Sequence, residues 1–180
     1  MKFYTKKGDD GSTGLIGEGR IRKYDPRLEA IGNFDEACAA LGLCRSFSTS
    51  GRVQEVALLL QKQLHLLMGE IASQDKHQVL SNGIDESHTK WVENIIEEFT
   101  SQIEMPKEFI IAGDTKSGAF FALARTTIRR AERKLTELYD HELVKNKHLL
   151  GFVNRLSSLL FVLELYENSI SGKGSQTLVK

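Results

Sequence analysis

Apolar residues recur at three- and four-residue spacing through five long segments, and this spacing constrains the fold more than any other feature of the chain. It places apolar side chains on one face of an α-helix, where they can pack against other helices. Only two prolines and few alternating patterns leave little room for a sheet. We therefore predict an all-α bundle of five helices, running from about Pro26 to Ser46, Arg52 to Ser73, Asp85 to Ile103, Ser117 to Asp140 and Leu149 to Ile170.

Length and composition favour a single globular domain over residues 1–180. The 180 residues are 41% hydrophobic and 27% charged, which suits one sizeable core. The 24 basic and 24 acidic residues cancel, so bulk charge gives no support for general attraction to nucleic acid or to a membrane. We expect neither as a partner, and any anion site must be local.

The two cysteines and the first residues bear on location. Cys38 and Cys44 lie six residues apart in an expected helix, on different faces and too distant for a disulfide. The first residues lack the apolar region of a signal peptide, and no apolar stretch has the length of a membrane span. We expect a cytoplasmic protein.

The first 25 residues are expected to form a loop, because glycines crowd among Thr, Lys, Asp and Ser at Gly8, Gly11, Gly14, Gly17 and Gly19. Converging backbone N–H groups, hydroxyls and lysines are what a phosphate cradle needs. The Walker A and Rossmann glycine patterns are both absent. Taken alone, the segment fits a flexible surface arm better than a phosphate cradle.

Two other segments fall outside the expected helices. Residues 109–113 are short and apolar between a proline and a turn, which favours an extended connector. The tail, residues 171–180, is rich in glycine and serine at its start and is expected to be flexible, without a chemical role.

The strongest local charge pattern is an arginine ladder, with Arg125, Arg129 and Arg133 at i, i+4 and i+8 and Arg130 beside them. Four guanidinium groups this close repel one another unless they lie near phosphates, carboxylates or solvent. By itself the ladder fits either a solvated basic stripe, with Glu132 as counter-charge, or one wall of an anion site. A separate face of the same helix is expected to pack, through Phe120, Ala124, Thr127, Ala131, Leu135 and Leu138.

Two polar residues interrupt apolar faces. On the first expected helix, viewed down the helix axis, Asp35 lies between Leu28 and Ile31, inside the apolar stripe. A buried carboxylate there would need a cation, and the arginine helix could supply one; the alternative is a hydrated aspartate at the edge of the bundle. An inward Asn154 on the fifth helix could hydrogen-bond either a ligand or another helix.

Covalent catalysis by the protein has no candidate residue. The five histidines show neither a His-x-x-x-His pattern nor a Cys/His pairing, so a dedicated transition-metal site is not expected. No Ser-His-Asp or Cys-His arrangement stands out either. The remaining possibilities are positioning and charge neutralisation, which suit a reaction whose substrates carry the reactive atoms.

Five motifs follow one another along the chain, and with them it resembles the PduO-type ATP:cob(I)alamin adenosyltransferases from about residue 3 to residue 165. The motifs are Tyr4-Thr5-Lys6-Lys7-Gly8-Asp9-Asp10-Gly11, Arg20-x-x-Lys23-x-Asp25-x-Arg27, Gly32-x-x-Asp35-Glu36, Arg125-Thr126 with Arg129-Arg130-Ala131-Glu132-Arg133, and Asn154-Arg155-Leu156-Ser157.

The resemblance implies a five-helix bundle, ferritin-like in appearance, assembled as a homotrimer with each site between adjacent subunits. It implies that Asp35 pairs with Arg129 across that interface. It also implies that Phe109 occupies the lower face of the cobalt and excludes the dimethylbenzimidazole ligand. The implied ATP-binding residues are Thr5, Lys6, Lys7, Gly8, Thr13, Gly14, Lys23, Arg129, Arg130, Ala131, Glu132, Arg133 and Asn154.

The implied reaction is attack by cob(I)alamin, or by a cob(I)yrinic acid a,c-diamide-type corrinoid, on the ribose 5′ carbon of ATP. It forms adenosylcobalamin and releases triphosphate, with Mg²⁺ accompanying the ATP and the corrinoid acting as substrate. The implied partners are a flavin-dependent reductase and a B12-dependent enzyme.

The sequence departs from the family pattern mainly on the corrinoid side. Ile111-Ala112-Gly113-Asp114 stands where the family has Leu-Pro-Gly-Gly, Cys38 replaces an asparagine, and Ser158 replaces an aspartate. These departures favour one alternative function, an ATP- or adenosylcobalamin-binding carrier or regulatory paralogue with little turnover.

Overall fold

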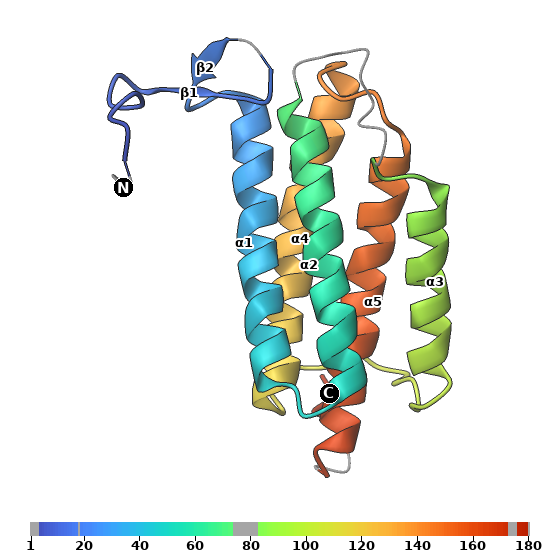
Figure 1. Cartoon of the computed structure of the whole chain (residues 1–180). Helices are drawn as coiled ribbons and strands as arrows, with labels where there is room; N and C mark the ends of the chain where they lie inside the picture. Colours follow the sequence, from blue (N-terminus) through green and yellow to red (C-terminus); the bar gives the residue numbers. More distant parts are fainter. Residues whose placement is uncertain (1–3, 18, 74–82, 173–175, 180) are drawn as a thin grey trace.

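Five helices dominate the computed structural model, which describes residues 4–17, 19–73, 83–172 and 176–179. Figure 1 shows the long helices lying side by side, with the shorter helix, residues 86–100, beside the last of them. The predicted all-α bundle is therefore confirmed. The helices are α1 (Pro26–Phe47), α2 (Gly51–Ala72), α3 (Glu86–Thr100), α4 (Lys116–Asp140) and α5 (His148–Ile170).

Side-chain caps fix where four of the helices begin. The carboxylate of Asp25 accepts a hydrogen bond from the Arg27 amide, and Pro26 follows it at the first helical position. Ser50 and Thr115 cap α2 and α4 in the same way, and Asp85 forms a capping box on α3. The predicted starts therefore lie within one residue of the observed ones.

The predicted end of the third helix is wrong by three residues. Beyond Ser101 the backbone switches to tighter bonds, from the Gln102 amide to the Phe99 carbonyl and from the Ile103 amide to the Thr100 carbonyl. The other helices end within one residue of the prediction.

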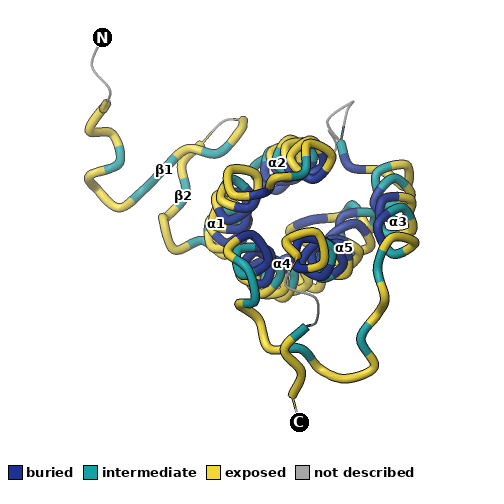
Figure 2. The backbone as a smooth tube through the Cα atoms, turned by 90° about the horizontal axis from the view of Figure 1, so that it is seen from below, coloured by how far each residue is buried: buried dark blue, intermediate teal, exposed yellow. Residues whose placement is uncertain are grey.

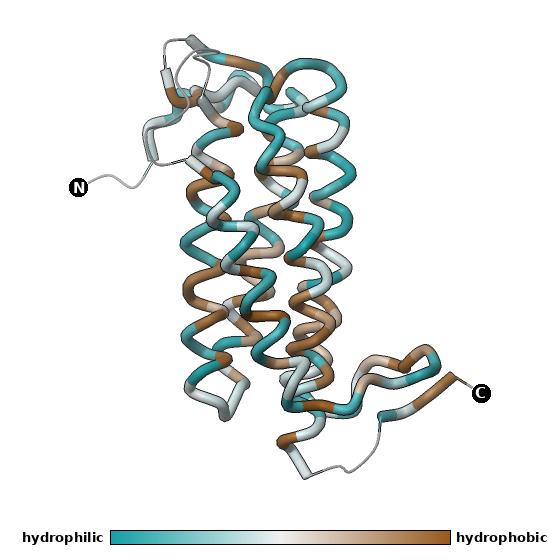
Figure 3. Tube along the Cα trace, turned by 90° about the vertical axis from the view of Figure 1, so that its right-hand side faces the viewer, coloured by the Kyte–Doolittle hydropathy of each residue, from teal (hydrophilic) through white to brown (hydrophobic). Residues whose placement is uncertain are grey.

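The core lies between α1, α2, α4 and α5, whose buried faces turn toward one another in Figure 2. α4 packs between α1 and α5, α2 packs on α1, and α3 packs mainly on α5, while Arg52 of α2 bonds to Glu98 of α3. Hydrophilic and hydrophobic residues alternate along each helix, as expected for amphipathic elements (Figure 3). The predicted packing face of α4 is confirmed, with Phe120 partly buried and the other members buried.

The expectation that no apolar stretch has the length of a membrane span is wrong by length and composition, because one helix among the described residues, α5, is long and apolar enough. However, 61% of its most apolar window is buried inside the bundle. That burial is what a central core helix shows. α4 and α3 cover it on two sides.

Of the two alternatives for Asp35, the structure shows the hydrated aspartate at the edge of the bundle, because its side chain is exposed. The buried face of α1 is centred on Ala30, Phe34, Ala37 and Leu41, and Asp35 lies well outside that face. Leu28 and Ile31, the large side chains near the start of the helix, are only partly buried. The buried face combines the small side chains of alanine with large ones, and Asp35 is not part of it.

The N-terminal segment contains a small hairpin where a loop was expected. Strands β1 (Ser12–Gly14) and β2 (Arg20–Arg22) pair antiparallel, with Thr13 opposite Ile21. The Ile16 amide donates to the Ala72 carbonyl, which ties the segment to the end of α2. The residues before the hairpin extend away from the bundle on the side of α1 (Figures 1 and 2).

The C-terminal tail differs from the expected flexible segment at residues 176–179. The Ile111 amide donates to the Thr177 carbonyl at 2.7 Å, and the Val179 amide donates to the Phe109 carbonyl at 2.8 Å. Ile110 and Leu178 form an antiparallel bridge between these two bonds. The tail and the extended connector therefore pair like two short strands, which composition alone could not reveal.

Candidate functional site

A pocket of about 530 Å³ lies where the connector before α4 meets α4 and α5. The connector contributes Phe109, which is 86% exposed, an unusual position for so large an aromatic side chain. The residues that line the pocket are Pro106, Lys107, Glu108, Phe109, Ile110, Arg125, Arg129, Ser157, Ser158 and Phe161. The structure thus brings Phe109 and Arg129, two residues singled out from the sequence, to one pocket.

Two guanidinium groups of the ladder have no carboxylate partner among the residues that the structure describes. Arg129 and Arg133 are both exposed, and their one side-chain hydrogen bond runs from Arg133 Nη1 to the Arg129 carbonyl at 2.9 Å. No ion pair joins Asp35 to Arg129 in the described part of this chain. Unpaired guanidinium groups that are held on a rigid helix can bind an anion.

Arg130 differs from its neighbours because α1 already binds it. Its Nε donates to Asn33 Oδ1 at 2.7 Å, and its Nη2 contacts the carboxylate of Glu36. These contacts make Arg130 a brace between α4 and α1. The arginines of the ladder therefore differ in their contacts. Arg130 is paired with α1, whereas Arg129 has no carboxylate partner among the described residues.

Asn154 does not point inward as expected, since its side chain is exposed. Its Nδ2 donates to Glu132 Oε1 at 2.9 Å, and its Oδ1 accepts from Arg155 Nη1 at 2.9 Å. Arg155 in turn donates to Glu93 Oε1 at 2.8 Å. Of the two uses left open for Asn154, the structure shows the bond to another helix.

The side chains of Arg20 and Lys23 contact the glycine-rich segment and organise it. The guanidinium of Arg20 donates to the Ser12 hydroxyl at 2.8 Å and also contacts the Lys7 carbonyl. Gly8 lies so near Lys23 that an added Cβ would come within 3.4 Å of the Lys23 ammonium. Lys23 and the turn at Gly8 are therefore neighbours, as a phosphate cradle requires.

Within one chain, this segment and the arginine face of α4 do not form a single site. The arm carrying Thr5, Lys6 and Lys7 extends outward from the side of α1 (Figure 1). No described hydrogen bond or ion pair links it to α4 among residues 4–17 and 19–25. The predicted ATP-binding residues thus fall into two groups on one subunit.

Sequence reasoning missed Glu164, which lies beside Arg125, one of the residues that line the pocket at Phe109. The side chain of Glu164 is fully buried on α5, and its Oε2 lies 3.9 Å from Nε of Arg125. The Arg125 guanidinium also lies over the Phe161 ring, with its Cζ 5.7 Å from the ring centroid. Burial raises the pKa of Glu164 to about 7; the charge of Arg125 opposes that rise, and Asp114 adds to it. The signal in the sequence was a single acidic residue inside the apolar run from Leu159 to Leu165.

Together, the fold and the pocket define a helical-bundle protein in which the guanidinium of Arg129 and the exposed aromatic side chain of Phe109 line one pocket.

Comparison with known proteins gives the family. The profile described as cobalamin adenosyltransferase matches residues 3–167. The chain is 34% identical to a corrinoid adenosyltransferase of Citrobacter freundii, covering 93% of this chain and 96% of that one. It is 32% identical to the corrinoid adenosyltransferase of Bacillus subtilis (strain 168), covering 97% and 90%. The chain therefore belongs to the cobalamin adenosyltransferase family.

A solved structure agrees with this membership. A variant PduO-type ATP:corrinoid adenosyltransferase from Lactobacillus reuteri, complexed with cobalamin and ATP, matches with a TM-score of 0.90. It is 30% identical, and the match covers 99% of both chains. The family resemblance identified from the motifs is confirmed, and with it the class of enzyme.

Proposed function

We propose that this enzyme transfers the 5′-deoxyadenosyl group of ATP to cob(I)alamin or to a cob(I)yrinic acid a,c-diamide-type corrinoid. One observation carries the proposal. In a chain of this family, Arg129, which has no carboxylate partner among the described residues, lines the same pocket as the exposed Phe109. Corrinoid and ATP are the two substrates.

In the transfer, the electron pair of cobalt(I) forms the Co–C bond to the ribose 5′ carbon. The C–O bond to the triphosphate breaks, and the electron pair of that C–O bond leaves with the triphosphate. Negative charge therefore grows on the leaving group. Arg129 and Arg133 would neutralise it together with Lys6, Lys7 and Lys23 and with the Mg²⁺ that accompanies ATP.

The apolar ring of Phe109 suits the opposite side of the acceptor. A flat aromatic face can cover the lower side of a corrin ring and exclude the dimethylbenzimidazole ligand. Four-coordinate cobalt that lacks this ligand would be easier to reduce from Co(II). Phe109 is free to do this because 86% of it is exposed.

A homotrimer would bring the two groups of ATP-binding residues together. The glycine-rich arm extends from its own bundle, Asp35 is exposed, and Arg129 is unpaired in the described chain. We infer that Asp35 pairs with Arg129 of the partner subunit and that the arm of one subunit meets the ladder of the next. Mass measurement by light scattering tests the trimer.

A turnover assay tests the function. The protein is mixed with ATP, Mg²⁺ and chemically reduced cobalamin, and the light-sensitive Co–C product is followed against a protein-free control. Several product molecules per site are expected. No product above the control would overturn the proposal.

A carrier or regulatory paralogue remains the second candidate, favoured by Cys38, Asp114 and Ser158 at corrinoid-side positions. It predicts tight binding of ATP or adenosylcobalamin without triphosphate release, and calorimetry with a phosphate assay separates the two. For the active enzyme, we propose a cytoplasmic location, a flavin-dependent reductase as electron source and a B12-dependent enzyme as recipient of the product.

A further inference from the structure

The segment that carries Phe109 is held from outside the bundle by the end of the chain. Two backbone hydrogen bonds flank the bridge between Ile110 and Leu178, from Ile111 to Thr177 and from Val179 to Phe109. The carbonyl of Phe109 itself accepts one of them. Residues 176–179 are called the C-terminal strand below.

Side chains anchor the C-terminal strand at a second point. The Thr177 hydroxyl donates to Asp114 Oδ1 at 2.6 Å, and the Thr177 amide donates to Asp114 Oδ2 at 2.9 Å. Asp114 immediately precedes Thr115, the cap of α4. The strand is thus bonded on both sides of the turn that leads from Phe109 into the arginine helix.

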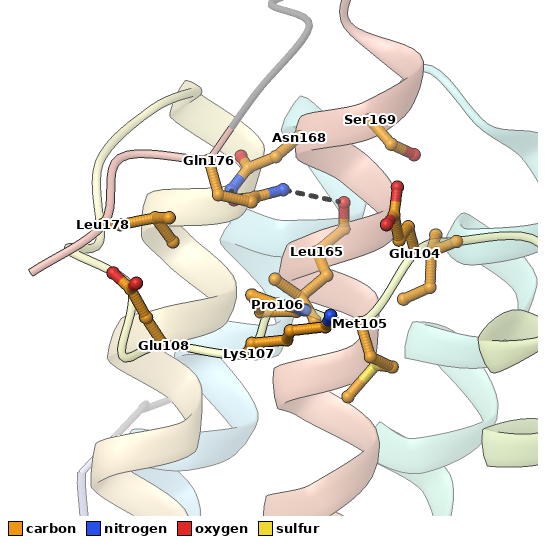
Figure 4. Close-up of a pocket in the computed structure, with 11 residues that line it drawn as sticks. Glu104, Met105, Pro106, Lys107, Glu108, Leu165, Asn168, Ser169, Gln176 and Leu178 are labelled. Atoms are coloured by element: carbon orange, nitrogen blue, oxygen red, sulfur yellow. Dashed lines mark hydrogen bonds between the residues drawn. The ribbon is translucent and has the colours of Figure 1, made fainter.

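A third anchor joins the strand to α5. Asn168 Nδ2 donates to Gln176 Oε1 at 2.9 Å, while Asn168 Oδ1 accepts from the Thr115 hydroxyl at 2.7 Å. Figure 4 shows Gln176 and Leu178 of the strand facing the connector at Pro106 and Glu108 across a second pocket, of about 520 Å³. The strand therefore completes one wall of this pocket and spans the distance between connector and helix.

These contacts matter because Phe109 has almost no packing of its own. A ring that is 86% exposed takes its position from its backbone, and a connector with few internal bonds would leave that backbone mobile. A side chain that must press on a flat ligand needs a fixed backbone. The C-terminal strand supplies hydrogen bonds at Phe109, Ile111 and Asp114.

We propose that residues 176–179 act as a positioning element for corrinoid binding, holding Phe109 over the acceptor through Thr177 and the paired backbones. This inference deepens the proposed function and rests on it. It assigns no chemical step to the tail, and ATP binding should not depend on it.

The test compares the unaltered chain with a truncation that lacks residues 176–180 and with Thr177→Val. Thr177→Ser keeps the hydroxyl and serves as the conservative variant. Thr136→Val is the general control, because the Thr136 hydroxyl bonds only to the Glu132 carbonyl of its own helix. Amide exchange over residues 109–111 is measured without ligands, and KM is measured separately for corrinoid and for ATP.

In the truncated chain we expect faster exchange over residues 109–111 and a rise of about tenfold in corrinoid KM, since several exposed hydrogen bonds are lost together. KM for ATP should stay constant. Thr177→Val should give a smaller rise in the same direction, and Thr177→Ser and Thr136→Val should give none. Bound cob(II)alamin should keep more of its lower ligand in the truncated chain, as read from its spectrum.

Unchanged exchange and unchanged corrinoid KM in the truncated chain would overturn this inference, as would an equal rise in both KM values. Absence of product with the unaltered chain would instead overturn the proposed function. The two failures are therefore distinct.

Discussion

Glu164 on α5 is completely buried, with one carboxylate oxygen 3.9 Å from Nε of Arg125 on α4. Neither carboxylate oxygen, nor that Nε, makes a hydrogen bond among the residues that the structure describes. The pair is close enough for attraction but is not a hydrogen-bonded salt bridge. Burial therefore dominates, and it raises the pKa of Glu164 from its ordinary value of 4.5 to about 7.

This buried acid predicts a pH dependence of stability. Between pH 4.5 and about 7 the folded chain keeps a proton that the unfolded chain has lost, so the free energy of unfolding falls as pH rises through this range. The fall from this residue alone is about 3 kcal/mol, and it is complete above the folded pKa. Urea unfolding at several pH values across the range measures it.

The variant Glu164→Gln should remove most of that slope and leave the protein more stable at the alkaline end. Glu97→Gln is the matched control, because Glu97 is exposed on α3. If both variants keep the slope of the unaltered chain, Glu164 is not its source.

Gly118 permits a close approach between α4 and α5. A Cβ there would overlap the Asn168 amide oxygen and lie 2.9 Å from the Thr115 hydroxyl, two atoms that bond to each other. Gly118→Ala should therefore lower the free energy of unfolding by about 1–3 kcal/mol. Gly151→Ala, whose Cβ meets only Thr89 Oγ1 at 3.9 Å, should instead be neutral or stabilising by up to about 1 kcal/mol. Equal effects in chemical denaturation would contradict this account.

Arg129→Ala should reduce kcat/KM at least about 100-fold, since it removes a charge that faces the departing triphosphate. A steady-state assay of adenosylcobalamin formation checks this. Arg52→Ala is the control, because Arg52 bonds to Glu55 and Glu98 between α2 and α3. The kcat/KM of Arg52→Ala should equal that of the unaltered chain. An unchanged kcat/KM in Arg129→Ala would refute the role of Arg129.

Deletion of residues 1–14 should abolish measurable ATP binding while leaving the helical content unchanged. The arm contributes β1 and the lysine-rich turn but no part of the helical core. Calorimetry with ATP and circular dichroism provide the two readouts. Retained ATP affinity would show that the glycine-rich segment is only a surface arm.

The sequence determined the helices well, because helix formation depends on local patterns. Pro26 after Asp25, and the capping residues Ser50 and Asp85, mark starts that the structure reproduces within one residue. The packing face of α4 followed from its periodicity in the same way. The motifs then gave the family, although the ATP-binding roles of their residues remain predictions.

Only the tertiary structure decided which polar groups meet. Asp35 is exposed because the buried face of α1 is centred on Ala30, Phe34, Ala37 and Leu41, and Asp35 lies outside that face. Arg130 pairs with α1 while Arg129 stays unpaired, and Thr177 reaches Asp114 across 63 residues of sequence. Such contacts join segments distant in the chain, and their geometry depends on how closely whole helices approach. Local spacing gave the five helices and the arginine ladder, whereas the packing of those helices decided the partners of Glu164, Arg130 and the C-terminal strand.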